Sequence, residues 1–365
     1  MLSQAQSDDP ETALLGKVRA RVAENLTRLP NFTCTETIQR SMWFKHEATP
    51  QMVDTVRLEV AYVQHKELYG WPGAARIDQT DISKLAGGSV GNGYFALFLN
   101  NIFRVQTTTF HFVGRTKLDG NDALQYDYNV PKSAGAYRLR SAKGDALVGY
   151  HGSFWVLDGT VDPVRINVVA DEVPSDIGFS AATSQLNYGA VAIGDNTYML
   201  PQNAQFIFTD TEGTENQSRL SFQSCHQFVG ESMIKFAPPP TESTVTLPAT
   251  FTVEMNLVTP IDSSAAAGGD PVLANTREKI ELNGKTVAPK GAKVAGRIGH
   301  ITKNGPVYVL DFVFTSIDFE GGHADITERE NQALVDNWTS IQRTSHLVLK
   351  PGTRLTLRSQ VKSAN

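Results

Sequence analysis

The sequence of 365 residues has very little cysteine: Cys34 and Cys225 are the two present, and no further pair could complete a zinc site. Each lies in a stretch that predicts a β-strand, "NFTCTETIQR" and "RLSFQSCHQF". They are either two buried inert thiols or one disulfide formed in an oxidising compartment. A disulfide would join the first strand of the first domain to its last. Cys34 shares a strand face with Phe32 and Ile38, whereas Cys225 alternates with polar residues, so that pairing requires a β-bulge.

Long apolar runs and basic blocks are also lacking. No run approaches the ~20 residues of a membrane-spanning helix, so no transmembrane segment is expected. The formal net charge is −5 and no lysine or arginine block is present, so nucleic acid is not an expected partner. The start, "MLSQAQSDDPE", is polar and lacks the basic and apolar regions of a signal peptide. Taken literally this indicates the cytosol, but a chain whose signal peptide has been removed would begin in the same way.

Motifs for metal, cofactor or phosphate binding are missing. The eight histidines do not cluster, and no H-E-x-x-H, C-x-x-C or phosphate-cradling loop occurs, so neither a metal site nor a cofactor is expected. "GGSVG" fits the G-x-S-x-G pattern and makes Ser89 a nominal nucleophile. The stretch before it is a poor buried strand, which favours a glycine-rich loop leading into a helix. We expect no histidine beside Ser89 and no enzymatic activity.

What is present is a β-rich composition, with charged residues at 19% and abundant glycine, threonine, serine and asparagine. One helix is clear, from Asp9 as N-cap and Pro10 at its first position to Pro30. Its apolar residues recur every three or four positions: Leu14, Val18, Val22, Leu26 and Leu29. A second helix is predicted over 92–103, and long strands with tight turns such as Asp119-Gly120 predict one large antiparallel sheet.

A composition shift divides the chain. "APPPTEST" predicts a stiff extended linker, which gives three parts: a first domain over 1–237, a Pro-rich linker over 238–246 and a second domain over 247–365. The second domain is again rich in strands, with Asn283-Gly284 as a hairpin turn. One charged stretch, "ITERENQALVDNWTSIQR", predicts a helix.

The first domain resembles the LolA-like half-barrels of the periplasmic lipoprotein-carrier superfamily. The resemblance is carried by an opening apolar helix, a long antiparallel meander, and strands such as "HGSFWVLDGTVDPVRINVVADEV". It implies a mainly β (α+β) fold in which a curved antiparallel sheet wraps helices around an apolar cavity. The sequence differs from the carriers in having a second domain.

The second domain resembles the β-barrel domain of TrbI-like conjugation-channel proteins. "LPATFTVEMNLVTPIDSS", Gly269-Asp270-Pro271 and Pro289-Lys290-Gly291 carry this resemblance. It implies a smaller C-terminal β-barrel. The channel proteins have a membrane anchor and an apolar insertion. At the insertion position this sequence has "ADITERENQALVDNWTSIQR", which is charged, so pore formation is not expected.

Both resemblances imply an exported, periplasmic or other cell-envelope protein without an active site. The first domain would bind an apolar ligand, a lipid or a lipidated partner, and the second would dock to an envelope protein. The expected ligand-binding residues are Val18, Val22, Val56, Leu58, Phe95, Phe98, Ile102 and Phe112. Two alternatives stay open: a structural module whose core is filled by its own side chains, and a serine hydrolase built on Ser89.

Overall fold

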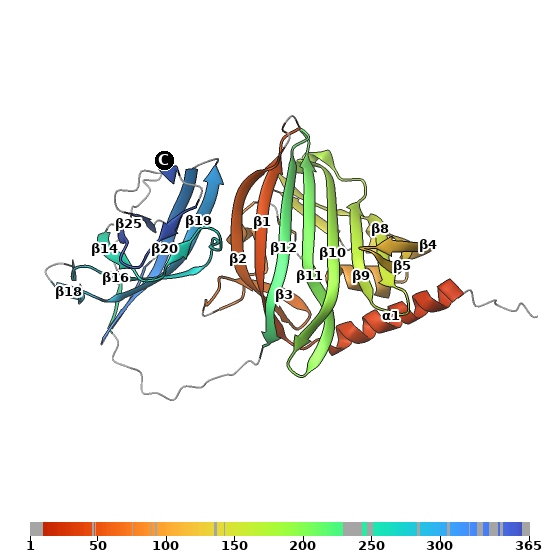
Figure 1. The fold of residues 1–365 in the computed structure, drawn as a ribbon, viewed down its shortest axis with the longest axis horizontal. Coiled ribbons are helices and arrows are strands. Elements are labelled where there is room, and N and C mark those ends of the chain that lie inside the picture. The colour runs from red at the N-terminus through yellow and green to blue at the C-terminus, as the bar shows by residue number, and fades with distance from the viewer. Residues whose placement is uncertain are drawn as a thin grey trace, which may run out of the picture. The chain divides into compact units, whose positions relative to one another are not determined.

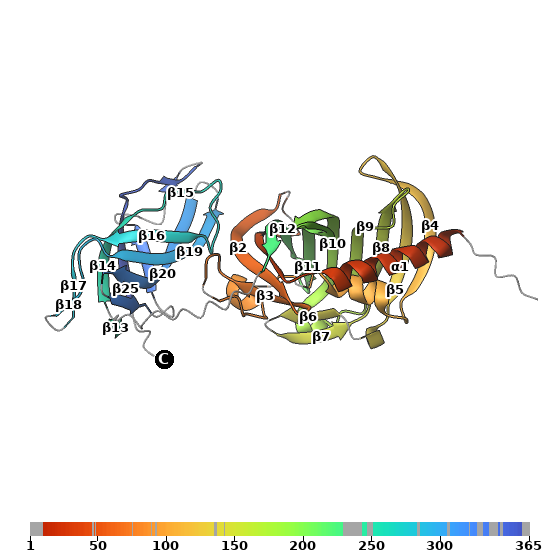
Figure 2. The same cartoon turned by 90° about the horizontal axis from the view of Figure 1, so that it is seen from below.

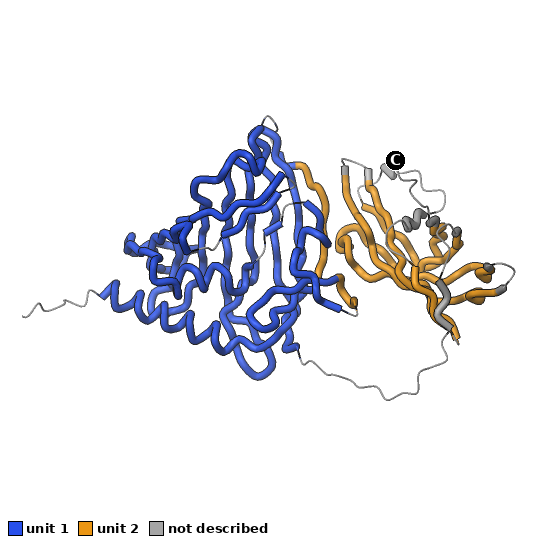
Figure 3. Tube along the Cα trace, turned by 180° about the vertical axis from the view of Figure 1, so that it is seen from behind, with its two compact units in different colours: residues 1–50, 59–70, 76–229 blue, residues 51–58, 71–75, 230–365 orange. Residues whose placement is uncertain are grey.

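The computed structural model describes residues 10–45, 47, 49–74, 76–88, 90–91, 93–134, 137–141, 143–228, 243–246, 251–282, 285–304, 307–320, 322–326, 331–335, 342–343 and 346–359. The chain forms two compact units (Figure 3). Unit 1 comprises Met1–Pro50, Glu59–Gly70 and Arg76–Val229, and unit 2 comprises Gln51–Leu58, Trp71–Ala75 and Gly230–Asn365. Both are mainly β, as the sequence predicted.

A ten-stranded antiparallel sheet makes up most of unit 1 (Figure 1). Its order is β3-β2-β1-β12-β11-β10-β9-β8-β5-β4, so sequence neighbours pair nearly everywhere, and β1 and β12 bring the two ends of the segment together. The strands are β1 (Phe32–Trp43), β2 (Gln51–Val63), β3 (Lys66–Gly70), β4 (Thr109–Leu118), β5 (Asn121–Val130), β8 (Tyr150–Leu157), β9 (Pro163–Ala170), β10 (Phe179–Ile193), β11 (Asn196–Asp210) and β12 (Glu215–Gln227).

Helix α1 (Pro10–Arg28) runs across this sheet at one end of its strands (Figure 2). Its stripe is confirmed: Val18, Val22 and Leu26 are buried, and Leu14 is half-buried. Hydrogen bonds hold the helix along its length. The Asn25 side chain donates to the Met199 carbonyl of β11 at 3.0 Å and accepts from the Met199 amide at 3.2 Å. Near the other end, the Tyr126 hydroxyl of β5 donates to the Glu11 carbonyl at 3.0 Å.

The second helix is shorter than predicted. It begins at Leu97, as α3 (Leu97–Leu99) followed by the π-helical segment η1 (Asn100–Arg104), whereas the pattern predicted a start near residue 92. The difference has a specific cause, because the amides of Gly93 and Phe95 donate to the side chain of Glu67 and hold that stretch as a turn. Three other short segments are α2 (Ser83–Ala86), η2 (Lys132–Ala134) and η3 (Ser175–Ile177).

Glycine turns connect the strands as the sequence predicted. Asp119 and Gly120 have φ values of 49° and 86°, which suit the type I′ turn that joins β4 to β5. A separate hairpin, β6 (Tyr137–Ser141) with β7 (Gly144–Val148), belongs to neither large sheet.

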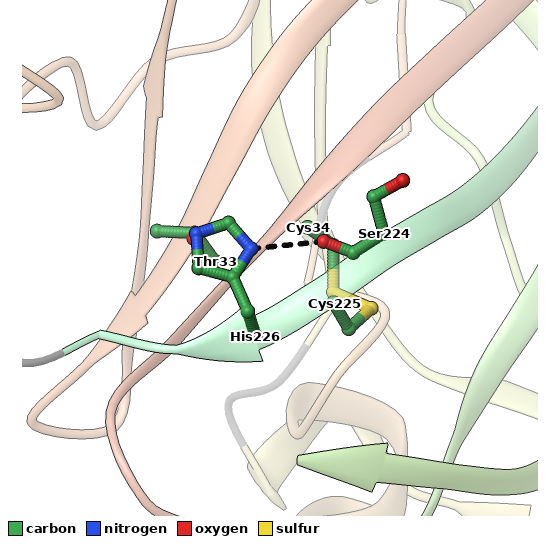
Figure 4. Close-up of a disulfide and its surroundings, with 5 residues drawn as sticks. All are labelled: Thr33, Cys34, Ser224, Cys225 and His226. Carbon is green, nitrogen blue, oxygen red and sulfur yellow. Dashed lines mark hydrogen bonds between the residues drawn. A yellow bond between two sulfur atoms is a disulfide. The ribbon is translucent and has the colours of Figure 1, made fainter. Parts of the chain in front are cut away.

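The predicted disulfide is present between Cys34 and Cys225, with Cα atoms 4.1 Å apart (Figure 4). The bulge that it required is there as well. Thr33 is opposite His226 and Thr35 is opposite Gln223, so β12 carries one extra residue at this point. Ser224 lies in the bulge and has a φ of 51°. The bulge brings Cys225 next to Cys34. The bulge is braced by His226, whose Nδ1 donates to the Ser224 carbonyl at 3.0 Å.

Unit 2 is built on a nine-stranded sheet in which six strands form a closed ring, β20-β19-β16-β14-β25-β22, because β22 pairs with both β25 and β20. The core inside includes Met255, Val294, Phe312, Phe314, Leu355 and Leu357. The strands of this unit are β13 (Ser243–Thr246), β14 (Phe251–Leu257), β15 (Ile261–Asp262), β16 (Pro271–Thr276), β17 (Ile280–Leu282), β18 (Lys285–Ala288), β19 (Lys293–Asn304), β20 (Val307–Phe319), β21 (Gly322–Asp325), β22 (Asn331–Val335), β23 (Gln342–Arg343), β24 (Val348–Leu349) and β25 (Arg354–Ser359).

One helix prediction in unit 2 is wrong. Residues 331–335 of the charged stretch form strand β22, whose pairing closes the ring, so tertiary pairing overrides local helix propensity. The Asn283-Gly284 turn lies outside the described residues, but its flanks β17 and β18 pair with Leu282 opposite Lys285, as a two-residue hairpin requires. Residues 238–242 of the predicted linker also lie outside the described residues, 243–246 form β13, and the domain boundaries stay a prediction.

His323 should make the stability of unit 2 depend on pH. Its Nδ1 lies 2.5 Å from Asp318 Oδ1 and its Nε2 lies 2.9 Å from Asp325 Oδ1. Hydrogen bonds to Asp318, then to Asp325, raise the pKa of His323. The stability gained by the protonated ring is therefore full below the ordinary pKa and is lost as pH rises through the raised one.

Substituting His323→Gln should lower the free energy of unfolding at about pH 6 by less than ~1 kcal/mol and leave it unchanged at about pH 9. Denaturant titration at the two pH values measures this. An equal loss at both would show that the ring contributes packing rather than charge.

Candidate functional site

A cavity of about 550 Å³ lies in unit 1. Three parts of the chain form it: the described residues of the segment 80–94, strand β6 of the separate hairpin, and strands β10 and β11 of the large sheet, with one residue of α3. Its lining is Thr80, Asp81, Ile82, Ser83, Gly88, Val90, Gly91, Tyr94, Phe98, Tyr137, Arg138, Leu139, Arg140, Ser141, Phe179, Ser184 and Phe206. These residues are far apart in sequence, and the fold brings them together.

The inner wall of the cavity is aromatic and aliphatic. Alternation along β6 buries Tyr137 and Leu139 and exposes the arginines between and after them. The ring of Tyr137 meets that of Phe98 edge-on, with centroids 5.4 Å apart. On the sheet side, Ser184 of β10 is paired in register with Phe206 of β11. The result is a wall that suits the apolar part of a ligand.

Charged groups lie at the more exposed part of the lining. Arg140 Nη1 is 2.8 Å from Asp81 Oδ2, and Arg138 forms an ion pair with Asp145. Hydrogen bonds from the Ser83 side chain and amide, together with Arg140, hold the pKa of Asp81 below its usual value. Asp81 is therefore charged at neutral pH, and the site combines an apolar wall with an ionic pair.

Glu67 fixes the segment that carries Tyr94. Its carboxylate accepts from the Tyr69 hydroxyl at 2.6 Å, the Gly93 amide at 2.7 Å and the Phe95 amide at 2.9 Å. Burial raises the pKa of Glu67, and these three hydrogen bonds oppose that rise because they favour the charged form. The backbone on both sides of Tyr94 is thus anchored by one side chain of β3.

Glu36 is a second acidic residue in this interior. It lies on β1 opposite Phe222, and 1% of it is exposed. Among the described residues no hydrogen bond reaches its carboxyl group. Burial raises the pKa of Glu36 well above its ordinary value, and the charge of Glu67 adds to the rise. The pKa values of both carboxyl groups are raised, and Glu36 is the one that has no hydrogen bonds within the described part of the chain to oppose the rise.

The residues that the sequence predicted to bind ligand do not all lie at the cavity. Val18, Val22, Val56, Leu58, Phe95, Phe98 and Ile102 are all buried, and Phe112 is half-buried. Of the eight, Phe98 lines the cavity. The ligand-binding set therefore stays a prediction, and the cavity points to other residues, above all Tyr94, Tyr137, Leu139, Phe179 and Phe206. The alternation in "AYRLRS" is the one signal that could have indicated Tyr137 and Leu139.

Ser89 lies outside the described residues, so the expectation that it has no histidine partner stays a prediction. In the parts of the chain that the structure describes, no group of three or more histidine, cysteine, aspartate or glutamate side chains could hold a metal ion. No helix among these residues is both long and apolar enough to cross a bilayer.

No protein-family model and no curated protein matches the sequence. Among solved structures, ComB10 of the Com Type IV secretion system of Helicobacter pylori is similar at 16% identity and a TM-score of 0.25, over 32% of this chain and 87% of that chain. A LolA superfamily protein from Nitrosomonas europaea is similar at 11% identity and a TM-score of 0.28, over 60% of this chain and 93% of that chain.

The lipoprotein LppX of Mycobacterium tuberculosis is similar at 13% identity and a TM-score of 0.22, over 60% of this chain and 97% of that chain. A LolA superfamily protein and a lipoprotein are therefore among the solved structures to which this chain is similar. The finer assignment of the C-terminal part to TrbI-like barrels stays a prediction.

Proposed function

We propose that this protein is a non-catalytic binding protein of the cell envelope, and that unit 1 holds an amphiphile such as a lipid or the lipid part of a lipoprotein. The observation that carries the proposal is the cavity of about 550 Å³, with its aromatic wall and its ionic pair of Asp81 and Arg140. Pockets for small ligands usually exceed ~300 Å³ and combine apolar walls with a few polar groups. Burial of apolar ligand surface supplies the affinity at roughly 25 cal/mol per Å².

The disulfide supports export. Cys34 and Cys225 are bonded, and disulfides persist in oxidising compartments such as the bacterial periplasm. We therefore assign the protein to the periplasm or another exported location.

Unit 2 has a different role in this proposal. The ring of six strands encloses a packed core, and a cavity of about 270 Å³ near Thr259 and Ile298 is smaller than usual ligand pockets. We propose that unit 2 docks to another envelope protein and that ligand binding belongs to unit 1.

Two variants test the cavity. Val90 lies in its lining and Val113 lies on β4 outside it, half exposed, so Val90→Trp and Val113→Trp add the same bulk inside and outside. We expect wild type to bind a fluorescent fatty-acid probe and to carry lipid detectable by native mass spectrometry. Val90→Trp should weaken probe binding at least about tenfold, or ~1.4 kcal/mol, and Val113→Trp should leave it unchanged.

The proposal fails if wild type binds no probe and carries no lipid. Unit 1 would then be a structural module, the alternative left open by the sequence. It also fails if both tryptophan variants bind like wild type, because the probe would then bind elsewhere. Thermal melts of each variant show whether the fold is intact.

A further inference from the structure

Tyr94 carries a buried hydroxyl group that has no hydrogen-bond partner among the described residues. The residue is 2% exposed and lines the cavity. The hydroxyl group of Tyr150 is also without a partner among the described residues, but Tyr150 does not line the cavity. Three other buried tyrosines of unit 1 have partners. Tyr69 donates to Glu67 at 2.6 Å, Tyr128 donates to the Asn167 carbonyl at 2.7 Å, and Tyr188 donates to the carbonyl of Tyr94 itself at 3.2 Å. A buried hydroxyl group that gave up water without gaining a partner costs folding free energy.

Several contacts fix where this hydroxyl group lies. Glu67 anchors the amides of Gly93 and Phe95 on either side of Tyr94. The centroid of the Tyr94 ring lies 6.2 Å from the ring centroid of Phe222 and 6.4 Å from that of Phe98. A Cβ atom at Gly91 would come within 1.6 Å of the hydroxyl oxygen, so the glycine leaves the space that the oxygen occupies. The group is thus held in place at the cavity wall.

The hydroxyl group is a hydrogen-bond donor throughout the physiological range. Burial raises the pKa of Tyr94 well above its ordinary value, and Tyr137, Glu36 and Glu67 raise it further. A neutral phenol in an apolar wall forms no hydrogen bond with a hydrocarbon chain, but it readily donates a hydrogen bond to a ligand oxygen.

We propose that the cavity selects ligands that carry an oxygen acceptor, such as an acid or ester group, and that the Tyr94 hydroxyl donates a hydrogen bond to that oxygen. The proposal rests on the amphiphile-binding function proposed above and narrows its ligand class. The binding of such a ligand satisfies a group that has no partner among the described residues, so the hydroxyl group favours the bound state over the free one.

Two fluorescent probes of similar shape separate the contribution of the hydrogen bond from that of apolar burial. Anilinonaphthalene sulfonate carries an oxygen acceptor, and N-phenylnaphthylamine has the same aromatic frame without one. For Tyr94→Phe we expect sulfonate binding to weaken about five- to tenfold while N-phenylnaphthylamine binding changes less than about twofold. The unliganded variant should melt at the same temperature as wild type or higher, because it no longer buries an unpaired hydroxyl group.

Tyr128→Phe is the matched control, since its buried hydroxyl group has a partner and does not line the cavity. It should melt at a lower temperature and bind both probes like wild type. Gly91→Ala is a second variant, which displaces the Tyr94 hydroxyl group without removing it, and it should repeat the selective loss of sulfonate binding. Probe fluorescence that remains in Val90→Trp comes from binding outside the cavity. It is subtracted from the fluorescence of each other variant.

The outcomes separate the two proposals. If wild type binds neither probe at the cavity, the amphiphile-binding function fails. If wild type binds both, but Tyr94→Phe weakens neither or weakens both equally, the function stands and the role of Tyr94 is wrong. A lower melting temperature for Tyr94→Phe would also overturn the role, because the hydroxyl group would then have a partner within the protein.

Discussion

Replacing Cys34 and Cys225 together by alanine is expected to lower the free energy of unfolding of unit 1 by about 2–5 kcal/mol. The bond spans 191 positions and joins β1 to β12, the strands at which the two ends of unit 1 meet. Loop-closure entropy for a loop of this length sets the upper end of the range, at about 5 kcal/mol. The lower end allows for structure that persists in the unfolded chain.

Chemical reduction of wild type separates the cross-link from the side chains. Reduced wild type keeps both cysteine side chains, including Cys34, which is fully buried. Its loss of stability measures the cross-link alone, and the further loss in the double alanine variant measures packing. Denaturant titrations of the three forms give the values. Equal stability of reduced and oxidised wild type would contradict the expectation.

The disulfide also shows what a sequence pattern can and cannot specify. The presence of two cysteines in predicted strands indicated the bond, and strict alternation argued against it because the two side chains had unlike faces. Ser224 resolves the conflict with a φ of 51° and one extra residue in β12. No local sequence pattern predicts a serine with a positive φ. The sequence therefore showed that a bulge was needed for the disulfide, but it did not show at which residue the bulge lies.

Local signals predicted the elements whose causes are local. Pro10 and the apolar stripe gave α1, and Asp119-Gly120 gave a turn with two positive φ values. The failures have distant causes. Residues 92–96 were expected to be helical, but Glu67 holds the amides of Gly93 and Phe95.

The cavity could not be predicted from the sequence, because it too depends on contacts between distant segments. Tyr94, Tyr137 and Phe206 come from three separate segments, and nothing in the spacing of their residues relates them. A periodicity argument can place a side chain on a face of its own strand or helix. It cannot show which faces meet without filling the space between them.

Replacement by glutamine is expected to change the stability in opposite directions at Glu67 and at Glu36. Glu67→Gln should lower the free energy of unfolding by about 2–3 kcal/mol, because the amide NH₂ would face donors that now bind a carboxylate. Glu36→Gln should raise the free energy of unfolding by about 1–3 kcal/mol above neutral pH, because a neutral side chain of similar shape lacks the penalty that a buried carboxyl group incurs once the same group of the unfolded chain ionises. Exposed Glu212→Gln serves as the control and should change nothing.

The pH dependence gives the sharper test of Glu36. Below the ordinary pKa of about 4.5, the carboxyl group is protonated in the folded and unfolded chains alike, so it costs nothing. As pH rises past that value the unfolded chain ionises first, so stability falls by up to about 1.4 kcal/mol per pH unit until the folded pKa is reached. Glu36→Gln should reduce this slope without abolishing it, since the pKa of Glu67 is also raised by burial. Parallel pH profiles for Glu36→Gln and wild type would show that Glu36 is solvated or hydrogen-bonded in the folded protein. Its carboxyl group could then no longer be counted as a neutral group in the interior beside Tyr94.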